Sequence, residues 1–184
     1  MSIYLLHGAF DCMAYEIPDR ALHDRIFPER FKIPPREEWP LPMVPSFGMA
    51  ADQPTRLADV HMVMANARLF SARAVDVMGL ADHGTLIPVE LADREDGQFH
   101  YFWSTRVVDC LDQERTTWIQ PGLLRNAVFD DSRLGDAELF TVPEDQRFQF
   151  SLFLRESMLA KIKKARLKGF LVKRGDPDPK PWKS

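Results

Sequence analysis

Aromatic and apolar side chains recur with a period of two in one stretch of the chain. The residues at every second position from 99 to 107 are Phe99, Tyr101, Trp103, Thr105 and Val107. This spacing places side chains on one face of a strand. The other face, which carries Phe102, is also too apolar for open solvent, so we expect an interior or helix-covered strand here.

A second apolar run, Leu86 to Leu91, precedes this strand, and the sequence DREDG separates the two. A short polar segment with glycine between two strand patterns predicts a hairpin. The tip of this hairpin would project Asp93, Glu95 and Asp96. A charged tip is commonly a solvated turn, and an interaction site is the alternative.

Apolar residues at steps of three and four mark helical segments. The first runs from Asp52 to Ala67 and has His61 on its apolar stripe, where we expect a core histidine rather than a catalytic one. The second runs from Ser71, a candidate N-cap, to Gly79, a candidate stop. The third spans residues 155–168 and has a basic second half.

Short strand patterns occupy residues 2–6, 123–129, 138–142, 148–154 and 170–172. Together the elements predict an α+β fold, with a mainly antiparallel sheet flanked by about three helices. A faint internal echo is also present. A strand, a helix, a glycine and IPVE in the first half match a strand, a helix, a glycine and FLVK near the end, either by duplication or by coincidence.

Seven prolines lie between Pro28 and Pro54. Proline lacks an amide donor, so we expect neither a helix nor an interior strand in this segment. Apolar residues such as Trp39, Leu41 and Phe47 interleave with the prolines, which favours an ordered belt over a disordered linker. A proline-rich ligand for a small adaptor domain is the alternative.

The chain of 184 residues is 45% hydrophobic, enough for one domain with a sizeable core. Its net charge of -3 is unevenly distributed. Residues 155–184 hold ten Lys/Arg and three Asp/Glu, which gives +7 and leaves -10 for residues 1–154. The body is therefore acidic and the C-terminal part is basic.

Two cysteines, Cys12 and Cys110, are too few for a disulfide scaffold, and we expect free thiols. His7, Asp11 and Cys12 lie close together, but no metal-ligand spacing is completed nearby, so we expect an ordinary loop, with no metal and no cofactor. The opening MSIYLLHGAF lacks a basic region and a long apolar run, which predicts a cytoplasmic protein with no membrane span.

An acidic corner follows the aromatic strand, where Asp109, Asp112 and Glu114 precede Arg115. An aspartate after a strand often caps the next helix, and the other charges can simply be solvated. A carboxylate pair for acid/base work or for a divalent metal is the alternative. That chemistry needs partners, and no lysine occurs between Lys32 and Lys161.

The run TRVVDCLDQERT (105–116), followed by LFTVPEDQRFQFSLFLRESMLAKIKKARLKGFLV (139–172), resembles the polymorphic-toxin immunity proteins of family 11, a former domain of unknown function. The residues that fit the first motif are Thr105, Arg106, Val107, Val108, Asp109, Leu111, Asp112, Glu114 and Arg115. Those that fit the second are Phe140, Pro143, Glu144, Phe153, Glu156, Leu167, Gly169 and Phe170. Thr116 stands where serine is commoner in the family.

The resemblance covers residues 59–174 and implies a cytoplasmic antidote that binds one cognate antibacterial toxin. We accordingly expect a single immunity domain over 1–184, with a variable part (1–58), a family-like core (59–174) and a mobile tail (175–184). The motifs that carry the resemblance look structural rather than catalytic.

The acidic body suits a protein that masks a basic surface, such as that of a nuclease acting in the cytoplasm. As partner-binding residues we predict the hairpin tip, Asp93, Glu95 and Asp96, together with Asp112, Glu114 and Arg115. Two alternatives remain open. One is a metal-dependent enzyme that uses Asp109, Asp112 and Glu114, and the other is nucleic-acid binding by the basic C-terminal helix.

Overall fold

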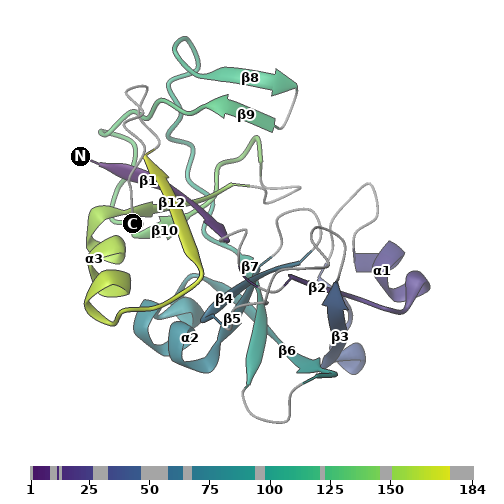
Figure 1. Ribbon diagram of the computed structural model, residues 1–184. Coiled ribbons are helices and arrows are strands. Elements are labelled where there is room, and N and C mark those ends of the chain that lie inside the picture. The colour runs from purple at the N-terminus through teal and green to yellow at the C-terminus, as the bar shows by residue number, and fades with distance from the viewer. Residues whose placement is uncertain are drawn as a thin grey trace.

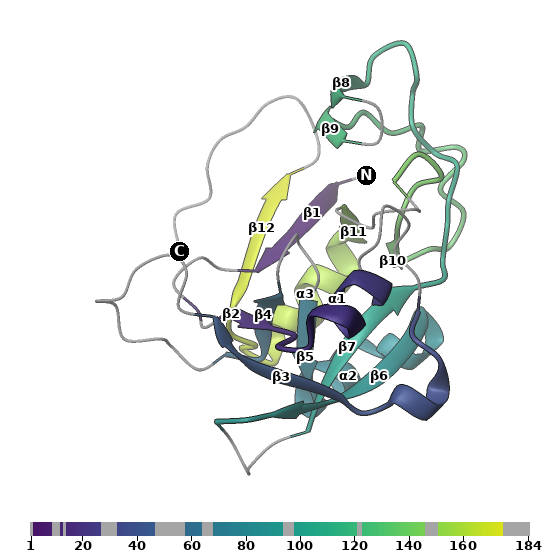
Figure 2. The same ribbon diagram turned by 90° about the vertical axis from the view of Figure 1, so that its right-hand side faces the viewer.

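A computed structural model describes residues 2–8, 12, 14–26, 33–46, 58–63, 68–93, 98–120, 123–145 and 151–174. The fold is α+β, as the sequence predicts. Over these residues the strands form a closed barrel, a four-stranded sheet and a separate two-stranded hairpin. Figures 1 and 2 show the hairpin at one end of the molecule and the barrel at the other.

The barrel order is β2-β3-β6-β7-β5-β4. Its strands are β2 (Ala14–Glu16), β3 (Leu41–Ser46), β4 (Val60–Val63), β5 (Arg68–Ser71), β6 (Gly84–Leu91) and β7 (Phe99–Ser104). The sheet order is β10-β11-β1-β12. Its strands are β1 (Ile3–Gly8), β10 (Leu139–Phe140), β11 (Leu152–Arg155) and β12 (Phe170–Arg174).

The hairpin consists of β8 (Thr117–Gln120) and β9 (Leu123–Asn126). The α-helices are α1 (Arg20–Ile26), α2 (Ala72–Met78) and α3 (Glu156–Lys164), and the short 3-10 helices are η1 (Arg36–Glu38) and η3 (Leu80–Asp82). The expected short strands at residues 2–6, 123–129, 138–142 and 170–172 therefore all exist, with shifted ends. The strand expected at 148–154 is β11 over its described part, and residues 148–150 lie outside the described residues, as does the expected mobile tail, 175–184.

The predicted hairpin and its aromatic strand are confirmed. β6 pairs with β7 in antiparallel register, with Ile87 opposite Tyr101. Phe99 and Tyr101 pack in the barrel core, while Phe102 packs on the other face against Phe70, with ring centroids 5.8 Å apart. Both faces of β7 are thus covered, as its pattern predicts. The strand ends at Ser104 rather than continuing to residue 107.

Helix α2 begins and ends where the sequence predicts. The Ser71 hydroxyl accepts a hydrogen bond from the Ala74 amide at 3.1 Å, which satisfies one free donor of the first turn. Gly79 ends the helix with φ of 61°, a left-handed conformation that glycine adopts without steric cost.

The internal echo corresponds to two segments with the same local topology. β5, α2 and β6 form one unit, in which β7 lies between the two parallel strands and runs antiparallel to both. β11, α3 and β12 form the other, with β1 inserted in the same way. Both are split β-α-β units, and their helices α2 and α3 contact each other.

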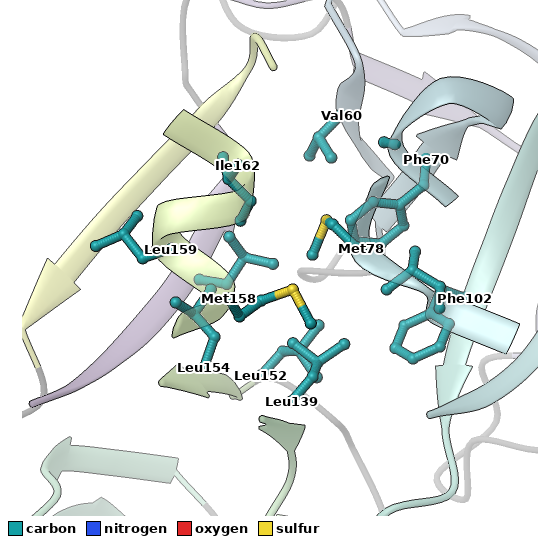
Figure 3. Close-up of a cluster of buried hydrophobic side chains, with 13 residues drawn as sticks. Val60, Phe70, Met78, Phe102, Leu139, Leu152, Leu154, Met158, Leu159 and Ile162 are labelled. Carbon is teal, nitrogen blue, oxygen red and sulfur yellow. The ribbon is translucent and has the colours of Figure 1, made fainter. Parts of the chain in front are cut away.

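A shared core lies between the two units. It contains Phe70 and Met78 from the first unit, and Leu154, Met158 and Ile162 from the second. Figure 3 shows Met158 and Ile162 of α3 directed toward the side of α2 and the barrel, while Leu159 points to the other side of the helix. Burial of each such side chain stabilises the fold by roughly 2 kcal/mol, so this contact holds the barrel and the sheet together.

The prediction of a helix from 52 to 67 is wrong over the described part, since Val60–Val63 is strand β4. Residues 52–57 and 64–67 lie outside the described residues. Val60 packs toward the helices, while His61 and Val63 face the barrel interior. There the ring centroids of His61 and Tyr15 are 5.3 Å apart. β4 is a short strand covered on both faces, and periodicity alone does not distinguish such an apolar run from part of a helix, which explains the error. His61 is nonetheless a core histidine, fully buried.

The exclusion of an interior strand from the proline-rich segment is also wrong. β3 forms part of the barrel wall with Leu41 and Met43 buried. Its first half, with Pro42, pairs in register with β6, and its second half, with Pro45, pairs with β2. Each half of β3 therefore pairs with one neighbouring strand only. A proline that lacks its amide donor can be accommodated there, because the edge without a registered partner does not need that donor.

Helix α3 ends at Lys164, four residues before the predicted end, and Arg166 has a φ of 52°. The chain then meets β4 through the buried Asp59. The Lys168 amide donates to Asp59 Oδ2 at 2.8 Å, and the amides of Asp59 and Val60 donate to the Lys168 carbonyl at 3.0 and 3.2 Å. Ser71 Oγ also donates to Asp59 Oδ1 at 3.1 Å. We call this set of contacts the Asp59 clasp; it joins the two split units.

Candidate functional site

The acidic corner is a turn closed by its own aspartate. Asp112 Oδ1 accepts hydrogen bonds from the amides of Glu114 and Arg115, both at 3.1 Å. The Thr116 amide donates to the Asp112 carbonyl at 2.9 Å. Asp112 therefore caps a turn, not the start of a helix, and the chain continues directly into β8 at Thr117.

The turn is fixed to the segment that follows β9. The Asp112 amide donates to the Val128 carbonyl at 2.8 Å, and the Thr116 hydroxyl both donates to that carbonyl and accepts from the Val128 amide at 3.2 Å. Leu111, buried beneath the turn, bridges to Phe129. The charged groups of the corner are thus held on a rigid backbone.

The three carboxylates of the corner differ in their surroundings. Asp109 forms an ion pair with Arg133, and Asp112 lies 3.7 Å from the guanidinium of Arg115. Glu114 is exposed. Among the described residues, no group of three His, Cys, Asp or Glu side chains could hold a metal ion. The corner presents carboxylates as separate surface charges.

Cys110 lies beneath this turn. It carries a free thiol, as expected. Burial, and then the negative charges of Asp109 and Glu144, raise the pKa of the Cys110 thiol to about 12. The thiolate is the reactive form, so Cys110 is inert at neutral pH and serves the core.

The β8–β9 hairpin follows the corner and stands apart from the other sheets (Figure 1). Trp118 packs against the core beneath the corner. Ile119, the next residue, is 58% exposed. The register runs from Trp118 opposite Leu124 to Gln120 opposite Leu123, so Ile119 is an extra residue in a β-bulge.

We define the corner–hairpin surface as the exposed or part-exposed residues of the turn and of β8. These are Asp112, Gln113, Glu114, Arg115, Thr117, Trp118, Ile119 and Gln120. Residues of a strand advance about 3.3 Å each, so Ile119 lies about 10 Å along the chain from the end of the turn. One continuous, firmly held segment therefore carries both the charges and the apolar residue.

The segment that builds this surface is acidic throughout. Residues 105–145 contain nine Asp/Glu and four Arg, which gives -5, and they contain no lysine. A hydrogen bond from Ser132 lowers the pKa of Asp130, and one from Lys161 lowers the pKa of Glu138. Both carboxylates therefore stay ionised at mildly acidic pH.

The predicted hairpin tip lies elsewhere. Asp93 is exposed at the end of β6, where the Tyr15 hydroxyl donates to its Oδ2 at 3.4 Å, while Glu95 and Asp96 lie outside the described residues. In Figures 1 and 2 the joined ends of β6 and β7 lie at the bottom and the β8–β9 hairpin lies at the top. The structure thus brings Asp112, Glu114 and Arg115 together and separates Asp93 from them.

The basic C-terminal helix is α3, whose last turns expose Lys163 and Lys164, followed by the exposed Arg166 and Lys168. Lys161 is engaged with Glu138, Nζ to Oε2, at 2.6 Å. Cations at this helix end complement the partial negative charge of its free carbonyls.

A buried polar cluster links the barrel to the sheet. Arg68, which is 4% exposed, donates to the Leu6 carbonyl at 2.8 Å. Burial lowers its pKa to about 10, and the nearby Asp145 and Tyr101 oppose that shift. Burial and the charge of Arg68 lower the pKa of His7 to about 4. These groups connect β1 and β5 and serve the architecture.

Sequence reasoning missed Ile119. Its signal is the segment TTWIQPG, in which two large apolar residues are adjacent in a short strand. Adjacent residues of a strand point to opposite faces, so one of Trp118 and Ile119 must leave the core. The sequence does not tell which of the two it is.

No family model matches the sequence, and no curated protein matches it. Within the part of the chain that the structure describes, no helix is both long and apolar enough to cross a membrane.

Proposed function

We propose that this chain is an immunity protein that binds and neutralises a cognate antibacterial effector toxin. The supporting observation is the corner–hairpin surface, where rigidly held carboxylates and one exposed isoleucine lie on an acidic lobe. Such a surface complements a basic protein surface with an apolar depression.

The resemblance of residues 105–116 to the immunity family supports the same proposal. In the structure this motif is the corner itself. Asp112, one of the matched positions, closes the turn by accepting hydrogen bonds from the amides of Glu114 and Arg115, two further matched positions.

The target would be a toxin that acts in the cytoplasm, with a nuclease as the leading candidate. Nucleases approach phosphate backbones through lysine and arginine, so their substrate-binding faces are basic. An acidic lobe of net charge -5 would be attracted to such a face and would raise the association rate. Bound there, the protein would exclude the nucleic acid and act stoichiometrically, without catalysis of its own.

Co-expression tests the proposal. The product of the adjacent reading frame is expressed in a sensitive host with and without this protein, and survival is recorded. We expect the neighbour to be toxic alone and the host to survive when both are present. Purification should then yield a stable stoichiometric complex by size exclusion. A harmless neighbour, or a toxic one that neither copurifies nor is neutralised, would contradict the proposal.

A further inference from the structure

We infer that Ile119 is the apolar anchor of this interface and enters a pocket on the toxin that is rimmed by lysine or arginine side chains. The inference rests on the proposed function and adds to it the residue and the surface chemistry by which the partner is bound.

The exposure of Ile119 sets it apart. Among the described residues, the large hydrophobic side chains counted as exposed are Ile119, at 58%, and Ile33, at 36%. A single exposed apolar residue is unremarkable by itself. Ile119 differs from Ile33 because it lies on a projecting hairpin, beside a charged turn, in a segment with a defined backbone conformation.

The hairpin holds Ile119 outward. Trp118 packs against the core beneath the corner and fixes the inner face of β8. The register contains two irregularities: Arg125 is the extra residue of β9, between Asn126 and Leu124, and Ile119 is the extra residue of β8. Bulges redirect side chains and are common at functional sites. Ile119 is thus presented to solvent by the backbone and needs no rearrangement to meet a partner.

The surroundings of Ile119 define the partner. The turn that precedes β8 carries Asp112 and Glu114, and the lobe built from residues 105–145 has a net charge of -5. A second acidic lobe placed against this one would bring like charges together. A basic protein surface satisfies the charges and supplies an environment for the isoleucine, so the occupant that fits is the basic face of the toxin.

This arrangement matches the anatomy of a strong interface. A few central residues that lose all contact with water carry most of the affinity, and a polar rim around them excludes water and selects the partner. Ile119 would be the central residue, and Glu114 and Arg115 would lie on the rim.

The test compares two isoleucines. Ile119→Asp and Ile33→Asp each replace an exposed isoleucine by the same charged residue, and Ile119→Ala removes the anchor without adding charge. The probe is the purified product of the adjacent reading frame, with affinity measured by calorimetry at fixed salt. Thermal unfolding should be close to that of the wild type for all three variants, since both positions are exposed.

We expect Ile119→Asp to weaken binding at least about 100-fold, Ile119→Ala roughly tenfold, and Ile33→Asp less than about threefold. If the wild type binds the probe and Ile119→Asp binds it equally well, Ile119 is not the anchor of the interface, while the proposed function stands. Equal losses for both aspartate variants would assign the effect to added charge and would also overturn the anchor. If the wild type does not bind the probe, both proposals fall. Self-association that is lost in Ile119→Asp would assign the surface to a second copy instead.

Discussion

His7 shows how one side chain couples the interior to pH. It lies on β1, half-buried next to Arg68 of β5 and Lys173 of β12, and burial with these two positive charges lowers its pKa from 6.5 to about 4. Protonation therefore favours the unfolded chain, where the imidazole is solvated and has its ordinary pKa.

The sign of the effect follows from linkage. Above about pH 6.5 the imidazole is neutral in the folded and in the unfolded state, so it does not change the free energy of unfolding. As the pH falls toward 4, the unfolded state takes up a proton that the folded state resists, so stability is lost over this window. We expect the free energy of unfolding, measured with urea, to fall from pH 7 to pH 4 less steeply in His7→Gln than in the wild type. Identical slopes would show that His7 is solvated in the folded state.

Single residues differ in how far sequence foretells their roles. Ser71 and Gly79 are predictable because a cap and a stop depend on neighbours three or four positions away. Asp59 is not predictable, because its partner Lys168 lies 109 positions along the chain. The acidic residues of the corner are evident from the sequence. The hydrogen bonds that Asp112 accepts are not, because they depend on how the chain turns there.

Among the elements, the connection between α3 and β12 depends on Gly169. Its φ is 86°, and a Cβ built on it would lie 2.4 Å from the Val60 carbonyl oxygen and 2.6 Å from Ala58 Cβ. A side chain here would thus push the connection away from β4 and break the Asp59 clasp.

Two glycine substitutions separate the cost of a positive φ from the cost of steric displacement. Gly135 also has a positive φ, 57°, but no atom lies within 4 Å of its built Cβ. We expect Gly135→Ala to lower the free energy of unfolding by about 1 kcal/mol, the cost of the left-handed conformation alone. Gly169→Ala should cost roughly 2 to 4 kcal/mol, because steric displacement is added. Equal losses in denaturant titrations would argue against a tight clasp.

Element types were predictable where turn or cap residues accompany the spacing of the apolar positions. The hairpin of β6 and β7 and the helices α2 and α3 follow from spacing and turn chemistry. β3 and β4 do not, because closure of the barrel decides their state. β4 is covered on both faces, and β3 keeps its prolines by pairing with one strand at a time.

Across the whole molecule, charge is divided between regions. Residues 105–145 carry -5, while residues 155–174 hold eight Lys/Arg and one Asp/Glu, which is +7. The α+β class was predictable from the mixture of patterns. The closed barrel was not, because it needs the parallel pairs β3–β6 and β2–β4, which join strands far apart in sequence.

Charge reversals at the two ends of the molecule test which end meets the partner. Glu114→Lys and Glu90→Lys change the net charge equally, and both residues are exposed, the first on the corner and the second on β6. We expect Glu114→Lys to weaken the complex roughly tenfold and Glu90→Lys less than about twofold, since only the first would face a basic partner directly.

Reversal of Asp93, Glu95 and Asp96 to Lys tests the hairpin tip in the same assay. Unchanged affinity in the triple variant would remove the tip from the interface. A loss of affinity confined to the triple variant would move the interface to the other end of the molecule.

Equal losses of affinity in Glu114→Lys and Glu90→Lys would reduce the role of the corner to long-range attraction.

The central position of β1 governs the order in which this protein can be completed during synthesis. β1 spans residues 3–8, yet it pairs with β11 and β12, near the other end of the described chain. The barrel strands are all translated by residue 104, whereas the acidic lobe rests on Ile3 and Phe153. A nascent chain still on the ribosome would thus have its barrel strands before its corner–hairpin surface is supported. That surface would be supported only when β11 emerges and pairs with β1.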